Sequence, residues 1–322
     1  MSVQQAQPNK TAVKRKRRFG MDNFELALLG LPVVVWYIVF CYLPMFGIII
    51  AFKKYNPNAG RNFVESLFKS DWVGFSNFRF IFQTPDALRV FRNTILYNAV
   101  FIVTGILLSV TLAILMSMLH SQVFAKICQT MMFLPHFLSM VVVGYFVFSF
   151  LSMDKGLLNQ ILKWAGKQPV LWYMEPKYWP FFMVFIYLWK SMGYSMVVYL
   201  ASIAGIDTSL YEAASIDGAS KWHQVRYIMI PLLTPIITIM FILAVGRIFM
   251  SDFGMFYFVP RRSGQLANVV QTVDVYVYNA LMSQNNLGFA AGASVTQALF
   301  GFVTIFAANR VVKTLNPENS LF

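Results

Sequence analysis

Long runs of apolar residues alternate with shorter polar segments along the whole chain. An α-helix needs about 20 residues to cross a hydrocarbon layer of ~30 Å, and six runs are long enough. They cover residues 25–51, 94–119, 127–151, 180–204, 228–250 and 289–308. This pattern predicts an all-α integral membrane protein with six transmembrane helices.

The composition supports this fold class. Of the 322 residues, 58% are hydrophobic and 12% are charged, whereas a soluble domain carries roughly 25% charged residues. The two cysteines, Cys41 and Cys128, both lie in apolar runs, so the sequence predicts no disulfide framework.

The ends of the chain differ from the apolar middle. Residues 1–24 form a basic tail that we expect to lack fixed structure, residues 25–315 form the six-span domain, and residues 316–322 form a C-terminal tail. The cluster at residues 14–18 directly precedes the first run, and such a cluster normally stays in the cytoplasm. With this cluster included, the lysines and arginines number 11 on the inner side and 13 on the outer side, so the totals do not decide the orientation and the cluster does. Six spans then place both termini in the cytoplasm.

Two long polar segments are expected on the outer side of the membrane. Within residues 52–92, aromatic and polar residues recur at helical spacing from residue 71 onward, which predicts an interfacial helix over 71–92. Residues 251–288 contain several glycine, proline and asparagine residues, which predicts an exposed loop with some order.

The polar segment between the fourth and fifth runs has the clearest local signals. Ser209 precedes Glu212 by three residues, which predicts a capping box that starts a short helix. Gly218 can end this helix in a left-handed conformation, and Ser220 can cap a second helix. Residues 207–227 are therefore predicted to form a helix-turn-helix at the cytoplasmic membrane face.

Motifs for enzymatic chemistry are absent. The sequence contains no His-Glu-x-x-His zinc motif, no Gly-x-Ser-x-Gly nucleophile elbow and no phosphate-binding loop. Its three histidines, His120, His136 and His223, are far apart in the sequence. We expect no catalytic residue, no metal site, no cofactor bound by this chain and no nucleic-acid partner. Without a phosphate-binding loop, this chain cannot itself hold ATP phosphates as P-loop proteins do.

A lysine stands near the middle of the fourth run. An ammonium group at the membrane midplane costs about 2.5–3.5 kcal/mol on insertion scales, so Lys190 should face water or a partner. Trp189 and Tyr194 flank it, and this mixture of rings and donors is typical of sugar sites, so all three are substrate-cavity candidates. A lysine that bonds to helix carbonyls or snorkels is the alternative. Arg247 is a further cavity candidate, although its place near the end of the fifth run favours snorkelling.

The segment Glu212-Ala213-Ala214, followed by Gly218 and Ile228-Met229-Ile230-Pro231, resembles the coupling loop of bacterial ABC importer permeases. Their pattern is Glu-Ala-Ala, three residues, Gly, nine residues and Ile-x-Leu-Pro, and Ile230 replaces the leucine here. The resemblance implies that this loop docks in a cleft of an ATPase subunit and transmits its closing motion to the spans. The docking residues implied are Glu212, Ala213, Ala214, Asp217, Gly218 and Pro231.

Two features of this loop suit docking. The small side chains of Ala213 and Ala214 allow another backbone to approach closely. Asp217 can pair either with Lys221 or with a basic residue of the partner, and the sequence does not separate these alternatives.

Other segments are similar to the sugar-type permeases, and to their subfamily for complex and acidic oligosaccharides. These segments are residues 72–78, 251–255, 273–278 and 309–313. The resemblance implies import by alternating access of a complex or uronic-acid-containing oligosaccharide, derived from alginate or pectin, across the bacterial cytoplasmic membrane. It also implies a second homologous permease, ATPase subunits that bind ATP and Mg, and an extracytoplasmic solute-binding protein.

Two other classes of transporter are alternatives. A permease for a non-sugar solute would keep the Glu212 loop but would usually lack the long aromatic outer segments. A secondary transporter should carry paired broken helices or carboxylates within its spans. Apart from their edges, the second to sixth runs contain no Asp or Glu, which disfavours ion coupling.

Overall fold

The computed structural model describes residues 21–79, 85–284, 286–317 and 320. The basic cluster at residues 14–18 and most of the C-terminal tail lie outside this part. The chain divides into two compact units, residues 1–49 and residues 50–322, and each is considered by itself.

The first unit is one long apolar helical stretch, and its helix begins at Met21. It comprises α1 (Met21–Tyr37), a π-helical turn (Ile38–Tyr42), α2 (Leu43–Met45) and the start of a 3-10 helix (Phe46–Phe52). The π turn ends two residues before Pro44, whose ring cannot donate a backbone hydrogen bond and clashes with the carbonyl one turn earlier. Its apolar side chains are exposed on all sides, as expected of a helix covered by lipid or another chain.

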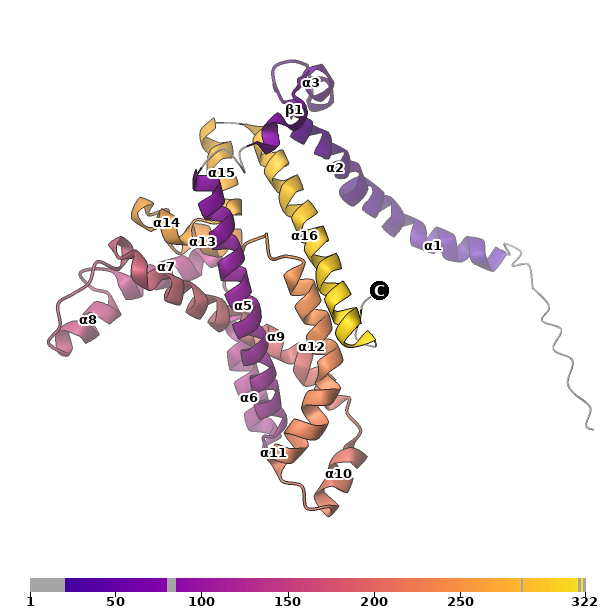
Figure 1. The fold of residues 1–322 in the computed structure, drawn as a ribbon, viewed down its shortest axis with the longest axis vertical. Helices are drawn as coiled ribbons and strands as arrows, with labels where there is room; N and C mark the ends of the chain where they lie inside the picture. Colours follow the sequence, from indigo (N-terminus) through magenta and orange to yellow (C-terminus); the bar gives the residue numbers. More distant parts are fainter. Residues whose placement is uncertain (1–20, 80–84, 285, 318–319, 321–322) are drawn as a thin grey trace, which may run out of the picture. The chain divides into compact units, whose positions relative to one another are not determined.

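Four further helices lie where the sequence predicts spans. They are α5 (Pro85–Ser117), α9 (Trp179–Ala204), α12 (Ile230–Val245) and α16 (Leu287–Leu315) (Figure 1). With the first stretch, the described residues contain five helices that are long and apolar enough to cross a membrane. Only 17–28% of the residues in the apolar windows of these four helices are buried. Most of their surface is therefore left for lipid or for another subunit.

The predicted third span, 127–151, is not one straight helix. The chain forms α6 (Gln122–Phe133), a 3-10 turn (Leu134–Phe137) and α7 (Met140–Leu151), and the two halves meet at an angle of 99°. Pro135 lies in the break, where it cannot donate a backbone hydrogen bond. Ser139 caps the new helix by accepting a hydrogen bond from the amide of Val142 at 3.3 Å.

The first outer segment forms a small ordered unit, not an interfacial helix over 71–92. It contains β1 (Lys53–Lys54) paired antiparallel with β2 (Asp71–Trp72), α3 (Phe63–Lys69) and a 3-10 helix (Gly74–Phe78). Residues 85–92 already belong to α5, and residues 80–84 lie outside the described part. The alternation of aromatic and polar residues thus reflects the packing of rings such as Phe52 on Trp72, whose centroids are 5.8 Å apart.

Asn77 attaches this outer segment to the start of α16. Its side-chain amide donates to the carbonyls of Ala51 and Lys53, at 3.0 Å each. A side chain at Gly288 or Gly292 would collide with Asn77. The two glycines therefore permit the close contact, and Asn77 explains one polar position of the segment that resembles sugar-type permeases.

Two later segments, 152–178 and 251–288, are largely helical. Residues 152–178 contain α8 (Leu157–Trp164) and two short 3-10 turns. The segment predicted as an exposed loop, 251–288, contains α13 (Phe253–Phe258), α14 (Ala267–Val270) and α15 (Val273–Gln284). Side chains of α5 hold it in place. Asn93 donates to the carbonyls of Asn268 and Gln271, Tyr97 to Val269, and Asn98 to Ile248 and Met250.

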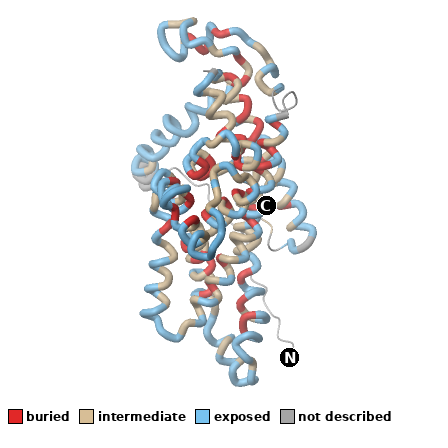
Figure 2. Tube along the Cα trace, turned by 90° about the vertical axis from the view of Figure 1, so that its left-hand side faces the viewer, coloured by how far each residue is buried: buried red, intermediate tan, exposed pale blue. Residues whose placement is uncertain are grey.

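The largest buried cluster lies where α5, α7, α9 and α13 to α15 meet (Figure 2). Trp179, Met183, Met255 and Leu266 are among its fully buried side chains. Gly193 lets α9 touch α6, because a Cβ atom there would lie 2.0 Å from the carbonyl oxygen of Met132. The bent α6–α7 pair is thus clamped against α9.

The polar segment between α9 and α12 begins with α10 (Thr208–Ile216). The predicted capping box of Ser209 and Glu212 is wrong, because Asp207 caps this helix. Its side chain accepts a hydrogen bond from the amide of Ser209 at 2.9 Å. A carboxylate one residue before the helix is a strong cap, and Ser209 consequently lies inside the first turn.

The end of α10 has the hydrogen bonds of a Schellman motif. Gly218 has a φ angle of +78°, its amide donates to Ser215, and the amide of Ala219 donates to Ala214 at 2.8 Å. Ser220 then caps α11 (Lys221–Gln224) through the amide of His223. The left-handed glycine and the second cap are as the sequence predicted.

The second helix runs without interruption into the fifth span. A π-helical turn (Val225–Met229) joins α11 to α12, so that residues 221–245 form one stretch. This π turn also ends two residues before a proline, Pro231. Pro231 therefore lies within a continuous helical stretch and does not begin a separate helix.

The cap at Asp207 predicts a pH-dependent first turn of α10. Hydrogen bonds from the backbone and side chain of Ser209 lower the pKa of the Asp207 carboxyl from 3.8. The stabilisation is complete above that ordinary value and is lost as the pH falls through the lowered pKa. Amide exchange at residues 209–212 should accelerate over this range, relative to α16.

The control is Asp207→Asn, which keeps an acceptor at the cap but does not titrate. Exchange in this variant should not show the extra acceleration at low pH. An identical pH dependence in both proteins would contradict the role of the carboxylate.

Candidate functional site

The residues predicted to dock on another subunit gather on the surface of α10 and of the turn after it. Glu212, Ala213, Asp217 and Gly218 are exposed, and Ala214 is half-buried. Pro231 is also exposed, but it is the second residue of α12. The structure thus brings five of the six predicted residues together and places the sixth in the helix that follows.

Two apolar side chains extend this surface. Ile216 is 87% exposed and Trp222 is 66% exposed, although both lie in a polar segment. Such side chains favour contact with another protein surface. The sequence reasoning missed them because it followed the polar motif and treated single apolar residues as incidental.

Asp217 does not pair with Lys221 in this structure. Among the described residues, the ion pairs are Lys69–Glu65, Arg89–Asp86 and Lys177–Glu175. The Asp217 carboxylate is exposed beside Gly218 and is available to a partner.

Gln224 fixes the angle between the two short helices. Its side chain is buried and donates to the hydroxyl of Ser215 at 2.9 Å. The same hydroxyl donates to the carbonyl of Tyr211 at 2.7 Å. α10 is therefore tied to α11, which is continuous with α12, so a force on α10 reaches the fifth span through bonded elements. No local sequence pattern distinguishes Gln224 from other polar residues.

Lys190 lies at the break between α6 and α7. Its ammonium group donates to the carbonyls of Pro135 at 3.2 Å, His136 at 2.9 Å and Leu138. An ammonium group has three N–H donors, and here all three are engaged. This is the carbonyl-bonding alternative that the sequence left open, and it leaves no free donor for a solute in this conformation.

The other cavity candidates are in different environments. Tyr194 is exposed and stacks on His136, with centroids 4.6 Å apart. Trp189 packs against the largest buried cluster. Arg247 is exposed two residues after the end of α12. The structure brings Lys190 and Tyr194 to the same break but does not bring Arg247 to them, and a cavity role for these residues stays a prediction.

Two segments selected only by resemblance, 251–255 and 273–278, meet in the structure. The amide and hydroxyl of Ser251 both donate to the Asp274 carboxylate at 2.7 Å. Gln297 of α16 donates to the Phe249 carbonyl at 2.7 Å and to the same carboxylate at 3.4 Å. This network fixes α15 relative to α16 and to the chain before α13.

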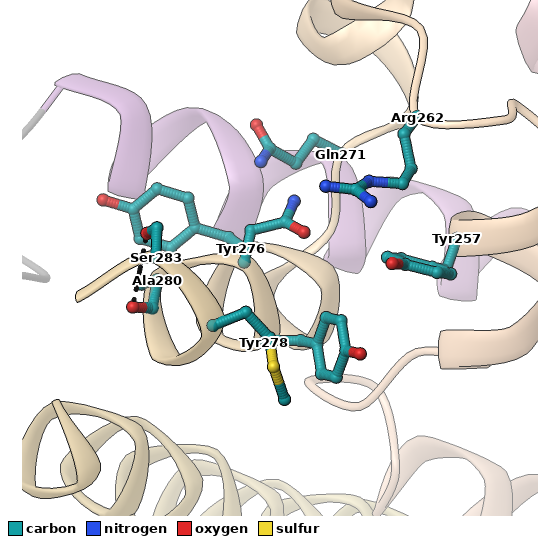
Figure 3. A pocket seen from close by; sticks show the side chains of 9 residues that line it. Tyr257, Arg262, Gln271, Tyr276, Tyr278, Ala280 and Ser283 are labelled. Atoms are coloured by element: carbon teal, nitrogen blue, oxygen red, sulfur yellow. Dashed lines mark hydrogen bonds between the residues drawn. The ribbon is translucent and has the colours of Figure 1, made fainter. Parts of the chain in front are cut away.

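Beside this network lies a cavity of about 600 Å³ (Figure 3). Aromatic, amide and cationic side chains of α13, α15 and the turns between them line it, among them Tyr257, Arg262, Gln271, Tyr278 and Asn279. The sequence reasoning missed this cavity. In the sequence, Arg262 belongs to a segment predicted as a loop, and Tyr278 belongs to a segment noted only for its similarity to sugar-type permeases.

Comparison with known proteins identifies relatives over most of the chain. The chain is 29% identical over 293 residues to the polygalacturonan/rhamnogalacturonan transport system permease protein YteP of Bacillus subtilis, covering 91% of this chain and 89% of the relative. It is 30% identical to the arabinooligosaccharides transport system permease protein AraP of Halalkalibacterium halodurans, covering 84% and 82%.

A solved structure has the same fold. It is described as a bacterial ABC transporter involved in the import of the acidic polysaccharide alginate, and one of its chains matches with a TM-score of 0.80 and 27% identity. The match covers 92% of this chain and 97% of the other. Residues 102–318 also match the family described as the binding-protein-dependent transport system inner membrane component. The chain belongs to this family and is a permease component of an ABC importer.

Proposed function

We propose that this chain is a permease subunit that imports an acidic oligosaccharide containing uronic acids. The observation that carries the proposal is the similarity, over about nine tenths of the chain, to a polygalacturonan/rhamnogalacturonan permease and to an alginate importer. Pectic polygalacturonan and alginate share the uronic-acid carboxylate. A uronic-acid-containing substrate is therefore what the two similar transporters have in common.

The complete transporter contains a second homologous permease, ATPase subunits and an extracytoplasmic solute-binding protein. The solved alginate importer, which also appears in complex with an alginate pentasaccharide-bound periplasmic protein, supports the binding-protein partner. The exposed apolar surfaces of the spans support a membrane-embedded partner. The ATPase subunits bind ATP and Mg and hydrolyse the ATP, whereas this chain forms part of the path through the membrane.

The ATPase docks on α10. The support is the exposed set of Glu212, Ala213, Asp217 and Ile216, and the bonded connection through Gln224 to α12. This surface consequently faces the cytoplasm, both termini are cytoplasmic, and the α13–α15 segment is on the outer side. In Figure 1, α10 and α15 lie at opposite ends of α5.

Docking through Glu212 predicts a loss of transport without a loss of folding. In the whole transporter, Glu212→Ala should lower uptake of labelled trigalacturonate by about tenfold or more, the range of a typical coupling free energy. Thr208→Ala is the control, because it changes an exposed residue of the same helix outside the docking set. The amount of folded chain in the membrane should be the same for both variants.

Two outcomes would contradict the proposal in different ways. Normal uptake by Glu212→Ala would remove the docking role. Wild-type uptake of neutral arabinotriose, but not of trigalacturonate, would show that the substrate is not acidic.

The orientation predicts opposite accessibility of two exposed positions. In a chain whose Cys41 and Cys128 are replaced by serine, a cysteine at Asn58 should react with a membrane-impermeant maleimide on spheroplasts. A cysteine at His120, in the turn between α5 and α6, should react only after permeabilisation. The reverse pattern would invert the topology.

A further inference from the structure

We infer that the cavity between α13 and α15 binds a uronate residue of the transported oligosaccharide, with Arg262 as the group that binds its carboxylate. This inference rests on the proposed function and adds a site to it.

The backbone at Arg261 and Arg262 is unusual. Their φ angles are +53° and +56°, a left-handed region that non-glycine residues seldom adopt. The turn is held by the amide of Arg261, which donates to Phe258, and by the amide of Ser263, which donates to Pro260. The hydroxyl of Ser263 also donates to the Tyr173 carbonyl at 3.0 Å. The direction of both arginine side chains is therefore set by a fixed turn.

The two guanidinium groups have different surroundings. That of Arg261 lies 3.9 Å from the ring centroid of Phe148, and Arg261 does not line this cavity. That of Arg262 lies 5.5 Å from the ring centroid of Tyr257 and lines the cavity. Figure 3 shows it above Tyr257 and beside Gln271. Tyr257 thus orients Arg262 toward the cavity without neutralising it.

Arg262 has no carboxylate partner in the part of the chain that the structure describes. The three ion pairs found there involve other arginine and lysine residues, and none of the residues lining this cavity is acidic. A guanidinium group that faces a cavity without a counter-ion favours an anionic ligand, and its planar fork matches a carboxylate.

The rest of the lining suits a sugar ring. The rings of Tyr257 and Tyr278 meet edge to face with centroids 5.2 Å apart, and Phe253 stacks on Tyr257 at 4.9 Å. Flat aromatic faces bind the C–H faces of a pyranose, and the phenol groups can bond to hydroxyls. The side-chain amides of Gln271 and Asn279, which also line the cavity, supply both donors and acceptors.

The size of the cavity is also appropriate. A volume of about 600 Å³ lies within the usual range for small-molecule sites, roughly 300–1,000 Å³. One or two sugar residues fit, and the rest of an oligosaccharide would extend beyond the opening. Because the three donors of Lys190 are engaged by carbonyls, Arg262 is the better placed cation for the carboxylate.

The test compares a charged substrate with its neutral analogue in the whole transporter. Uptake of trigalacturonate and of its methyl ester is measured at concentrations below saturation for wild type, Arg262→Asn and Arg261→Asn. Asparagine tolerates the left-handed backbone at both positions, so the variants differ mainly in which guanidinium is lost. Arg262→Asn should lower trigalacturonate uptake by about tenfold, the effect of losing a charge-assisted hydrogen bond.

Uptake of the methyl ester should change by less than about twofold in the same variant, because an ester cannot form the ionic pair. Arg261→Asn should leave uptake of both substrates near wild type. Arg262→Lys, which keeps the charge but loses the planar fork, should give an intermediate rate for the acid.

Three results would overturn the inference: no change in Arg262→Asn, equal losses for acid and ester, or the same selective loss in Arg261→Asn. If Arg262→Asn fails to assemble, Arg262→Lys decides. An unchanged ratio of acid uptake to ester uptake in Arg262→Lys, compared with wild type, would overturn the inference. A failure of the proposed function is separate, because wild type itself would then not take up trigalacturonate.

Discussion

Inside a membrane, each backbone carbonyl needs a donor from the protein, and the break between α6 and α7 leaves several carbonyls without the donor that a continuous helix would supply. Lys190 of α9 donates to the carbonyls of Pro135, His136 and Leu138 at this break. The carbonyl of Pro135 also accepts from the amide of Leu138 at 3.2 Å, so Lys190 matters most for the other two. Gly193, one turn further along α9, allows the contact because it places no side chain against Met132. Together these two residues hold the chain where it turns through 99° between α6 and α7, and α7 then packs against α13.

The position of the cavity follows from this arrangement. α7 supplies Phe148, whose ring lies beside the guanidinium of Arg261, whereas Arg262 remains directed at the cavity. Asn93 and Asn98 of α5 bond to the carbonyls of Asn268 and Ile248, and so hold the chain on either side of α13. At the opposite end of the helices, α10 is bonded through Gln224 to the stretch that becomes α12. α12 and α16 touch at Gly246 and Gly301, and Gln297 of α16 bonds to Asp274 in the first turn of α15. A series of contacts and hydrogen bonds thus connects the proposed docking surface on α10 with the cavity.

Much of this fold could be predicted because helices in a membrane are specified by long apolar runs, and five of the six runs became continuous helical stretches. The turn at Gly218 was also predictable, since only its local conformation was needed. The break near Pro135 was not, because its stability depends on Lys190, which is more than 50 residues away. The capping box failed because Asp207 was a stronger cap than Ser209. The cavity was missed because it combines residues of α13, α15 and a left-handed turn that no local pattern brings together.

The most direct test of this account is the thermal unfolding of the assembled transporter with Lys190 changed. Lys190→Met removes all three donors and leaves the carbonyls of His136 and Leu138 without the bond from Lys190. An unsatisfied carbonyl costs about 1–3 kcal/mol. The unfolding midpoint should fall by several degrees, with faster amide exchange at residues 140–143. The midpoint should fall less in Lys190→Gln, because the amide keeps two donors. In Lys163→Met, at an exposed position of α8, the midpoint should equal that of wild type. A midpoint and exchange pattern in Lys190→Met equal to those of wild type would contradict the account.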